Sequence, residues 1–259
     1  MGQYTTDQVL ALIEAAGETW AVDLGEEDLS DIDLSPETLA VKLRERWGNK
    51  AGTPPWWHPG DPTTGRPAGL NLRRASLEVA NFRRAKAQGA DFSGANLYGF
   101  VAGGAQLEDA VFEDAYMLGS SFHGANLARA NFRRATLESV FMGESNLRGA
   151  CFQEAVGPGV SMWDSHLEEA DFRDAQMPRA NLQKTHLRGA NLRGAKLPGA
   201  NLSWADLTGA DLRGADLTGA DLRHAILRDA DLRGALLEGA DLDGADLEGA
   251  KTSEHVEGS

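Results

Sequence analysis

The chain has only one cysteine, Cys151, among its 259 residues. A single cysteine excludes a disulfide framework within the chain and any zinc site built from several thiolates. No apolar run approaches the roughly 18 residues of a transmembrane helix, so we expect no membrane-spanning segment. The first residues lack the basic and apolar regions of a secretory signal, which favours a cytoplasmic protein.

Basic residues are scarce relative to acidic ones. The 25 Lys and Arg face 39 Asp and Glu, which gives a formal net charge of −14. Such a charge disfavours non-specific attraction to nucleic acid or anionic lipid, so we expect neither direct nucleic-acid binding nor a membrane partner. Hydrophobic residues make up 42% of the chain, with six Trp and nine Phe, which is too many for a disordered protein.

A five-residue repeat runs without interruption over residues 70–249. Stepping by five from Leu72 gives 36 central positions ending at Leu247, of which 22 are Leu, seven are Phe and four are Met. Ala stands two residues before the centre in 28 repeats, and the last position is Gly in 18. A period of five leaves no apolar face on an α-helix and does not match the alternation of a long strand. We therefore expect a chain that turns after every five residues and stacks its coils.

The phenylalanines give the size of a coil. A separation of four repeats recurs in Phe92, Phe112, Phe132, Phe152 and Phe172. This spacing predicts four-sided coils with one repeat on each side, and 36 repeats predict nine such coils. We expect these five rings to form one stacked inner column with a structural role. The side that carries this column is called side 1, and sides 2, 3 and 4 follow it, centred on Leu77, Phe82 and Ala87 in the first coil.

The tandem A(D/N)LXX motif is clearest over residues 205–224, which read ADLTGADLRGADLTGADLRH. This pattern resembles the pentapeptide-repeat proteins over residues 70–249 of the chain. The resemblance implies an all-β fold, a right-handed quadrilateral β-helix, in a bacterial protein. It also implies one specialised activity, because some members mimic B-form DNA, bind DNA gyrase and protect it from quinolones.

The segment before the repeats reads differently. Residues 1–51 predict a small α-helical region, in which Thr6 is expected to cap a first helix and Ser35 to open a second. Between the two helices, three further pentads predict a fragment of coil that is out of register with the main array. They are centred on Leu24, Leu29 and Leu34.

Two further segments flank the array. Residues 52–69 form a Pro- and Trp-rich linker, and we expect Trp56 and Trp57 to plug the open end of the rod. Residues 250–259 form a tail too polar to plug the other end. Two interpretations of that end stay open: an end-to-end homodimer through the C-terminal coil, or a solvated tail over a frayed coil.

Outward-facing apolar residues gather on sides 2 and 3 of the early and middle coils. An exposed apolar patch usually marks an interface. Either the N-terminal helices fold back over this patch, or a separate protein of unknown identity binds there. The candidate partner-binding residues are Tyr98, Val101, Tyr116, Leu118, Phe141, Val156 and Trp163.

Chemistry-bearing motifs are few. No nucleophile–base arrangement or phosphate loop is visible, so we expect no catalytic residue, no cofactor and no enzyme. Side 4 carries Asn146, His166, His186 and Asp206, each one coil after the last. Two imidazoles one coil apart could share a divalent cation, but we interpret them as stacked, neutral surface histidines and assign no metal ligand.

Two functions follow. The first is a rigid protein–protein interaction scaffold, and the alternative is a DNA-mimicking binder of DNA gyrase that gives quinolone-type resistance. Three features speak against the alternative. No side is uniformly acidic, since side 1 has eight basic and eight acidic outward residues. No loop interrupts the array, and the hydrophobic C-terminal dimer module of the resistance proteins is missing.

Overall fold

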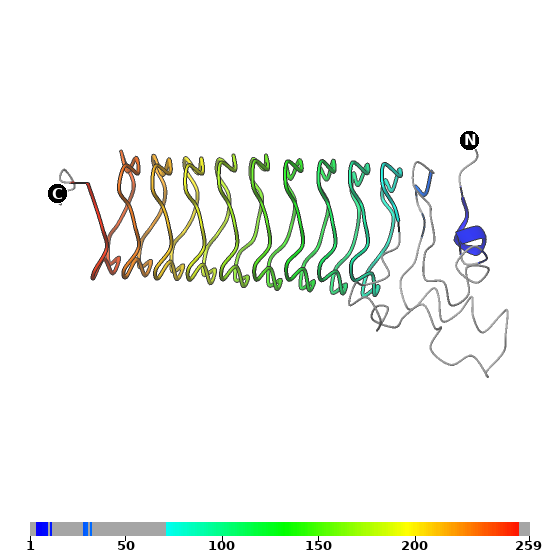
Figure 1. Ribbon diagram of the computed structural model, residues 1–259, viewed down its shortest axis with the longest axis horizontal. Coiled ribbons are helices and arrows are strands. Elements are labelled where there is room, and N and C mark those ends of the chain that lie inside the picture. The colour runs from blue at the N-terminus through cyan, green and yellow to red at the C-terminus, as the bar shows by residue number, and fades with distance from the viewer. Residues whose placement is uncertain (1–3, 10, 12–27, 31, 33–70, 254–259) are drawn as a thin grey trace.

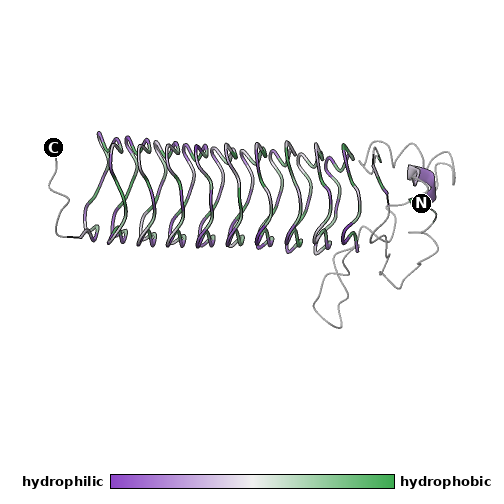
Figure 2. Ribbon diagram, turned by 90° about the horizontal axis from the view of Figure 1, so that it is seen from above, coloured by the Kyte–Doolittle hydropathy of each residue, from purple (hydrophilic) through white to green (hydrophobic). Residues whose placement is uncertain are grey.

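The structure, a computed structural model, describes residues 4–9, 11, 28–30, 32 and 71–253, of which the last range forms a rod of stacked coils (Figure 1). Parallel bridges join positions four repeats apart, beginning with Asn71 and Asp91 and ending with Asp231 and Lys251. Each coil therefore contains four repeats. Among the described residues every β pairing is an isolated bridge, so the sides of the coil are shorter than conventional strands. Figure 2 shows hydrophobic and hydrophilic stretches alternating within each coil.

Each repeat ends in a tight turn that explains its glycines. The Leu72 amide donates to the Asp91 carbonyl of the next coil at 2.7 Å, and the Ala75 amide donates back to the Leu72 carbonyl at 3.2 Å. Between them Arg74 has a φ of 55°, and all 36 residues at this position are left-handed, 18 of them glycine and 18 of other types. Glycine adopts this conformation without a steric cost, which accounts for its frequency at every fifth position.

The Asp or Asn before each centre is a turn residue. Its side-chain oxygen accepts a hydrogen bond from the amide two residues later, as from Arg73 to Asn71 at 3.1 Å and from Arg223 to Asp221 at 3.1 Å. Short polar side chains stabilise turns in this way. The Asp or Asn of the motif therefore stabilises the turn by a hydrogen bond to the backbone, in addition to any charge that it adds to the surface.

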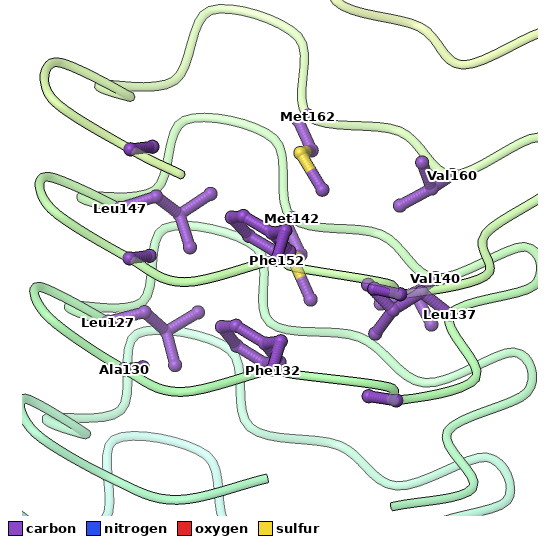
Figure 3. Close-up of a cluster of buried hydrophobic side chains, with 14 of the residues drawn as sticks. Leu127, Ala130, Phe132, Leu137, Val140, Met142, Leu147, Phe152, Val160 and Met162 are labelled. Carbon is purple, nitrogen blue, oxygen red and sulfur yellow. The ribbon is translucent and has the colours of Figure 1, made fainter. Parts of the chain in front are cut away.

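The inner column of phenylalanines stacks in parallel. Successive rings from Phe92 to Phe172 have centroids 4.7–4.9 Å apart and interplanar angles of 3–10°. This separation equals the ordinary spacing between paired strands, so the backbone pairing sets the stacking distance. Figure 3 shows Phe132 and Phe152 one above the other, with Leu127 and Leu147 in a neighbouring column.

Irregular repeats stay packed because a large residue offsets a small one. Phe100 stands where most repeats have Ala and precedes the small centre Ala102; it is fully buried, with its ring 4.9 Å from that of Phe82. Gly157 is a glycine at a centre, and Val160 lies beside it, 3.4 Å from where a Cβ would stand. The interior volume of the coil is therefore conserved while individual positions vary.

The N-terminal end of the rod carries an additional partial coil. Asp28 pairs with Ser76, the Leu29 amide donates to the Ser76 carbonyl at 2.7 Å, and the Asn81 amide donates to the Ile32 carbonyl at 2.7 Å. Leu29 and Ile32 are buried in the core of the rod. The pentad around Leu29 thus stacks under side 2, although more than two coil lengths of sequence separate it from Leu77. The pentads around Leu24 and Leu34, like Trp56 and Trp57, lie outside the described residues.

A helical turn covers this partial coil. Residues 6–9 and 11 are helical, and Thr5 caps them, not Thr6 as the sequence predicted. The Gln8 amide donates to Thr5 Oγ1 at 3.3 Å, while Gln8 Oε1 accepts from the Thr5 amide at 2.7 Å, which makes a capping box. Val9 is buried in the core of the rod. Figure 1 shows the described part of this helix at the end of the rod and not alongside the middle coils.

At the C-terminal end, no described residue covers the last coil of the rod. The pairing continues to Lys251, two residues beyond the predicted boundary. Leu232 is 3% exposed, Leu237 and Leu242 are half-buried, and Leu247 is 39% exposed, so the inner side chains of the last coil reach solvent. The boundaries predicted after residues 51 and 69, and the second helix expected from Ser35, lie outside the described residues. In the described part of the chain, no helix has the length and apolar character needed to cross a bilayer.

Candidate interaction surface and histidine cluster

The predicted partner-binding residues all lie on the outside of the rod. Five of the seven are well exposed, from 36% for Trp163 to 55% for Phe141, whereas Val101 and Leu118 are half-buried. We call this set the aromatic patch: Tyr98, Val101, Tyr116, Leu118, Phe141, Val156 and Trp163. The described helical turn does not cover it.

Small residues shape the patch around two rings. The Trp163 indole lies over Gly143, where a Cβ would stand only 2.8 Å from Trp163 Cε2, and it continues to His123, with ring centroids 6.2 Å apart. The indole therefore spans one whole coil along side 3. Phe141 lies between Ser121 and Ser161 in the adjacent row, so both rings rise above small neighbours.

Other exposed apolar side chains lie outside the patch. Trp204 is 57% exposed and stacks on His224 with centroids 4.3 Å apart. Val79, Ile226 and Leu236 are also exposed. These residues do not belong to the cluster that the sequence predicted, but the outward position of each within its repeat already indicates that its side chain is exposed.

The two histidines of side 4 stack. The rings of His166 and His186 have centroids 4.6 Å apart and an interplanar angle of 15°. Two further residues complete what we call the histidine cluster: Glu168, whose Oε1 lies 3.2 Å from His166 Nδ1, and Arg148. Arg148 Nη2 lies 2.8 Å from His166 Nδ1 and 3.1 Å from Glu168 Oε1.

The other two residues that the sequence placed in this row of side 4, Asn146 and Asp206, make different contacts. Asn146 donates to Asn126 Oδ1 at 2.9 Å, and Asp206 accepts from the Thr208 hydroxyl at 2.6 Å. The sequence analysis missed Glu168 and Arg148. The sequence pattern could have identified both, because each stands two residues after one of the four predicted residues of side 4, and that step returns to the same side of the coil.

Glu168 is the acidic member of this cluster. Burial opposes its ionisation, but a backbone hydrogen bond, the close contact with the His166 ring and the charge of Arg148 together lower its pKa below the ordinary value. Its second oxygen, Oε2, is buried and has no hydrogen-bond partner within the described residues. Glu168 is thus a carboxylate with unused acceptor capacity.

Many charges on side 1 form ion pairs. Arg173, Arg213 and Arg233 each donate to the Asp two residues before, with shortest N–O distances of 2.6–2.7 Å. Although burial opposes it, the hydrogen bond from Arg233 lowers the pKa of Asp231 to about 2. These exposed pairs contribute little stability individually, but they leave side 1 with a mixed surface and not an acidic one.

Comparison with known families identifies the repeat. The family of pentapeptide repeats matches the chain in eight copies, over residues 68–99, 105–143, 125–156, 159–189, 175–214, 185–223 and 215–251. These matches span well over half of the sequence, and the chain therefore belongs to the pentapeptide-repeat family.

Two solved structures are similar to much of the chain. HetL, a pentapeptide repeat protein involved in heterocyst differentiation regulation from the cyanobacterium Nostoc sp. strain PCC 7120, is 26% identical with a TM-score of 0.68, covering 96% of this chain and 97% of HetL. QnrB1, a plasmid-mediated fluoroquinolone resistance protein, is 23% identical with a TM-score of 0.51, covering 71% of this chain and 88% of QnrB1. Both support a right-handed β-helix. No curated protein sequence matches the chain.

Proposed function

We propose that this protein is a non-catalytic scaffold that binds a protein partner through the aromatic patch. The observation that carries the proposal is the exposure of five large apolar side chains, 36–55% each, on adjoining sides of one rod. Soluble proteins rarely expose such clusters unless they bind something. Aromatic residues are also enriched among those that dominate binding energy at interfaces.

The backbone of the rod makes the patch rigid. The Phe141 amide donates a hydrogen bond to the Ser120 carbonyl of the adjacent coil at 2.9 Å. Next to Trp163, the Asp164 amide donates to the Gln183 carbonyl at 2.9 Å. A ring on a paired backbone loses little further freedom when it binds, which favours affinity. HetL, which is similar over nearly its whole length, is itself involved in regulation, and a regulatory role is compatible with a scaffold.

Affinity purification from the native host tests the proposal. We compare the wild-type protein with the double variant Phe141→Asp/Trp163→Asp, and use Trp204→Asp as a control for an equally exposed ring outside the patch. We expect one partner to be retained by the wild type and the control and lost by the double variant. The partner is then purified and titrated against all three proteins.

Two results would contradict this function. One is that no partner is enriched over a bait-free control. The other is that the double variant binds the purified partner as tightly as the Trp204→Asp control does.

The gyrase alternative has narrower support. The acidic net charge and the rod shape favour it, but the arginine–aspartate pairs of side 1 give that side no acidic face. The likeness to QnrB1 is one of fold alone. A supercoiling assay with purified gyrase, with and without a quinolone, separates the two functions, because a scaffold for another partner leaves both reactions unchanged.

We further propose that the rod comprises nine coils, and that two copies associate end to end through the open C-terminal coil. The exposed Leu247 and the half-buried Leu237 and Leu242 support this association, because a second copy would remove them from water. We also propose that the protein acts in the cytoplasm, as its sequence predicts.

A further inference from the structure

We propose that the histidine cluster binds a divalent transition metal of the zinc type. The ligands are His166 Nδ1, the Glu168 carboxylate and one ring nitrogen of His186. This site lies on side 4 and is independent of the partner proposed for the aromatic patch. The two histidines by themselves supply too few ligands for such a site, and Glu168 provides the third.

The distances suit a tetrahedral ion. Zinc binds imidazole nitrogen and carboxylate oxygen at about 2.0–2.2 Å, which places two ligand atoms of a tetrahedral site about 3.3 Å apart. His166 Nδ1 and Glu168 Oε1 are 3.2 Å apart. The candidate ligand atoms of His166, Glu168 and His186 all lie within 4.8 Å of one another, so a modest rotation of the His186 side chain completes the set.

A cation already lies between two of these ligands. Arg148 Nη2 is 2.8 Å from His166 Nδ1 and 3.1 Å from Glu168 Oε1, so both atoms face its guanidinium group; in the tautomer that leaves Nδ1 unprotonated, their lone pairs converge on it. The Arg148 side chain is 48% exposed and can move into solvent when an ion takes this place. Glu168 Oε2, buried without a partner among the described residues, supplies a further oxygen of the same carboxylate.

The donor set indicates the class of metal. Two imidazoles and one carboxylate are ligands of zinc, with the fourth position open to water. Because His166 and His186 belong to successive coils that pair through these residues, the bound ion would also link the coils. We therefore expect metal binding to stabilise the rod, since only the folded chain holds the ligands together.

Isothermal titration of the full-length protein with zinc chloride tests the site. We expect one high-affinity ion per chain, and Co²⁺ in its place should give the visible absorption of a tetrahedral complex. His186→Ala and Glu168→Gln should each weaken the affinity by about tenfold or more, as loss of even indirect support to a metal ligand does. Matched controls are His123→Ala and His224→Ala, which remove histidines that stack on tryptophans.

Arg148→Ala gives a readout that a purely structural role would not produce. Because the guanidinium competes for the same lone pairs, its removal should tighten zinc binding, whereas loss of a ligand weakens it. The proposal is overturned if neither the wild type nor Arg148→Ala binds zinc, or if the double variant His166→Ala/His186→Ala binds it as the wild type does. His58 and His255 are present in every variant, so they cannot produce a difference.

Discussion

At the scale of the residue, position within the repeat determines what a side chain does. Phe132 and Phe141 are the same amino acid in neighbouring parts of the chain. Phe132 stands at a centre and is fully buried between two stacked rings, whereas Phe141 stands one residue before a centre and is 55% exposed. The identity of the side chain therefore says less about its surroundings than its place among the five positions.

This contrast gives a matched pair of substitutions. Phe132→Asp buries an unpaired charge and removes a core ring, so it should lower the free energy of unfolding by at least about 3 kcal/mol. Phe141→Asp should change it by less than about 0.5 kcal/mol, because surface substitutions rarely do more. Urea unfolding of both variants checks the prediction, and similar midpoints for the two would contradict the inward assignment.

At the scale of the element, the turn is the unit that repeats. Its third residue is left-handed in every repeat, and the row that begins with Val79 continues with Gly99 and Gly119. Val79 has a φ of 57°, which is costly for a β-branched residue. The rod tolerates this strain because the flanking backbone hydrogen bonds hold the turn in place.

Gly119→Val isolates the cost of that conformation. A Cβ at Gly119 would meet nothing within 4 Å, so the backbone conformation is the main cost of a side chain there. With a φ of 67° at this position, valine should destabilise the protein by about 1 kcal/mol, since the left-handed conformation costs a side chain roughly 1–2 kcal/mol while glycine loses more entropy on folding. Gly119→Asn, whose residue type tolerates this conformation better, should cost less in the same urea titration.

The aspartates of the turns predict a dependence on pH. Burial opposes the ionisation of Asp171, but hydrogen bonds from Arg173 and Gln153 lower its pKa below the ordinary 3.8. A carboxyl group whose pKa is lower in the folded state stabilises the protein above its unfolded pKa, and loses that effect as the pH falls through the folded value. The melting temperature of the protein should therefore decrease as the pH is lowered below about 4.

Asp171→Asn is the matched variant, because asparagine keeps the oxygen that accepts the turn amide and stands naturally one coil later at Asn191. The wild type should melt at a higher temperature than this variant at pH 7, and the difference should shrink below about pH 4. A difference that stays constant from pH 7 to pH 2 would show that the charge of Asp171 contributes nothing.

At the scale of the whole molecule, the two ends of the rod differ. Leu29, Ile32 and Val9 cover the first coil, while the last coil leaves Leu247 39% exposed. An uncovered end of a β-helix exposes both core side chains and unpaired backbone groups, and a second copy can satisfy both.

Sedimentation analysis tests this association. Leu247→Lys should shift the protein from dimer to monomer, because it places a charge at the end of the rod. Leu236→Lys is the control, since Leu236 is 58% exposed but lies on the outer face of the same coil. A wild type that stays monomeric at high concentration, or a Leu236→Lys variant that dissociates equally, would contradict an end-to-end dimer.

The sequence alone determined the repeating part of this protein. A strict period of five, with Phe at every fourth repeat from Phe92 to Phe172, specifies which side chains point inward and which lie one coil apart, because each repeat pairs only with its nearest neighbours. The four-repeat step between bridged residues and the stacked column from Phe92 to Phe172 follow from that regularity.

Only the tertiary structure decided the features that break the period. Leu29 stacks beneath Leu77 across more than two coil lengths of sequence, a separation that no local rule specifies, because any pentad can cap any coil of matching shape. The Trp163 indole lies over Gly143, and Arg148 reaches both His166 and Glu168, because long side chains choose among several neighbouring coils by packing and charge. Register is a property of the backbone and can be read from the sequence, whereas these contacts depend on side-chain conformations in three dimensions.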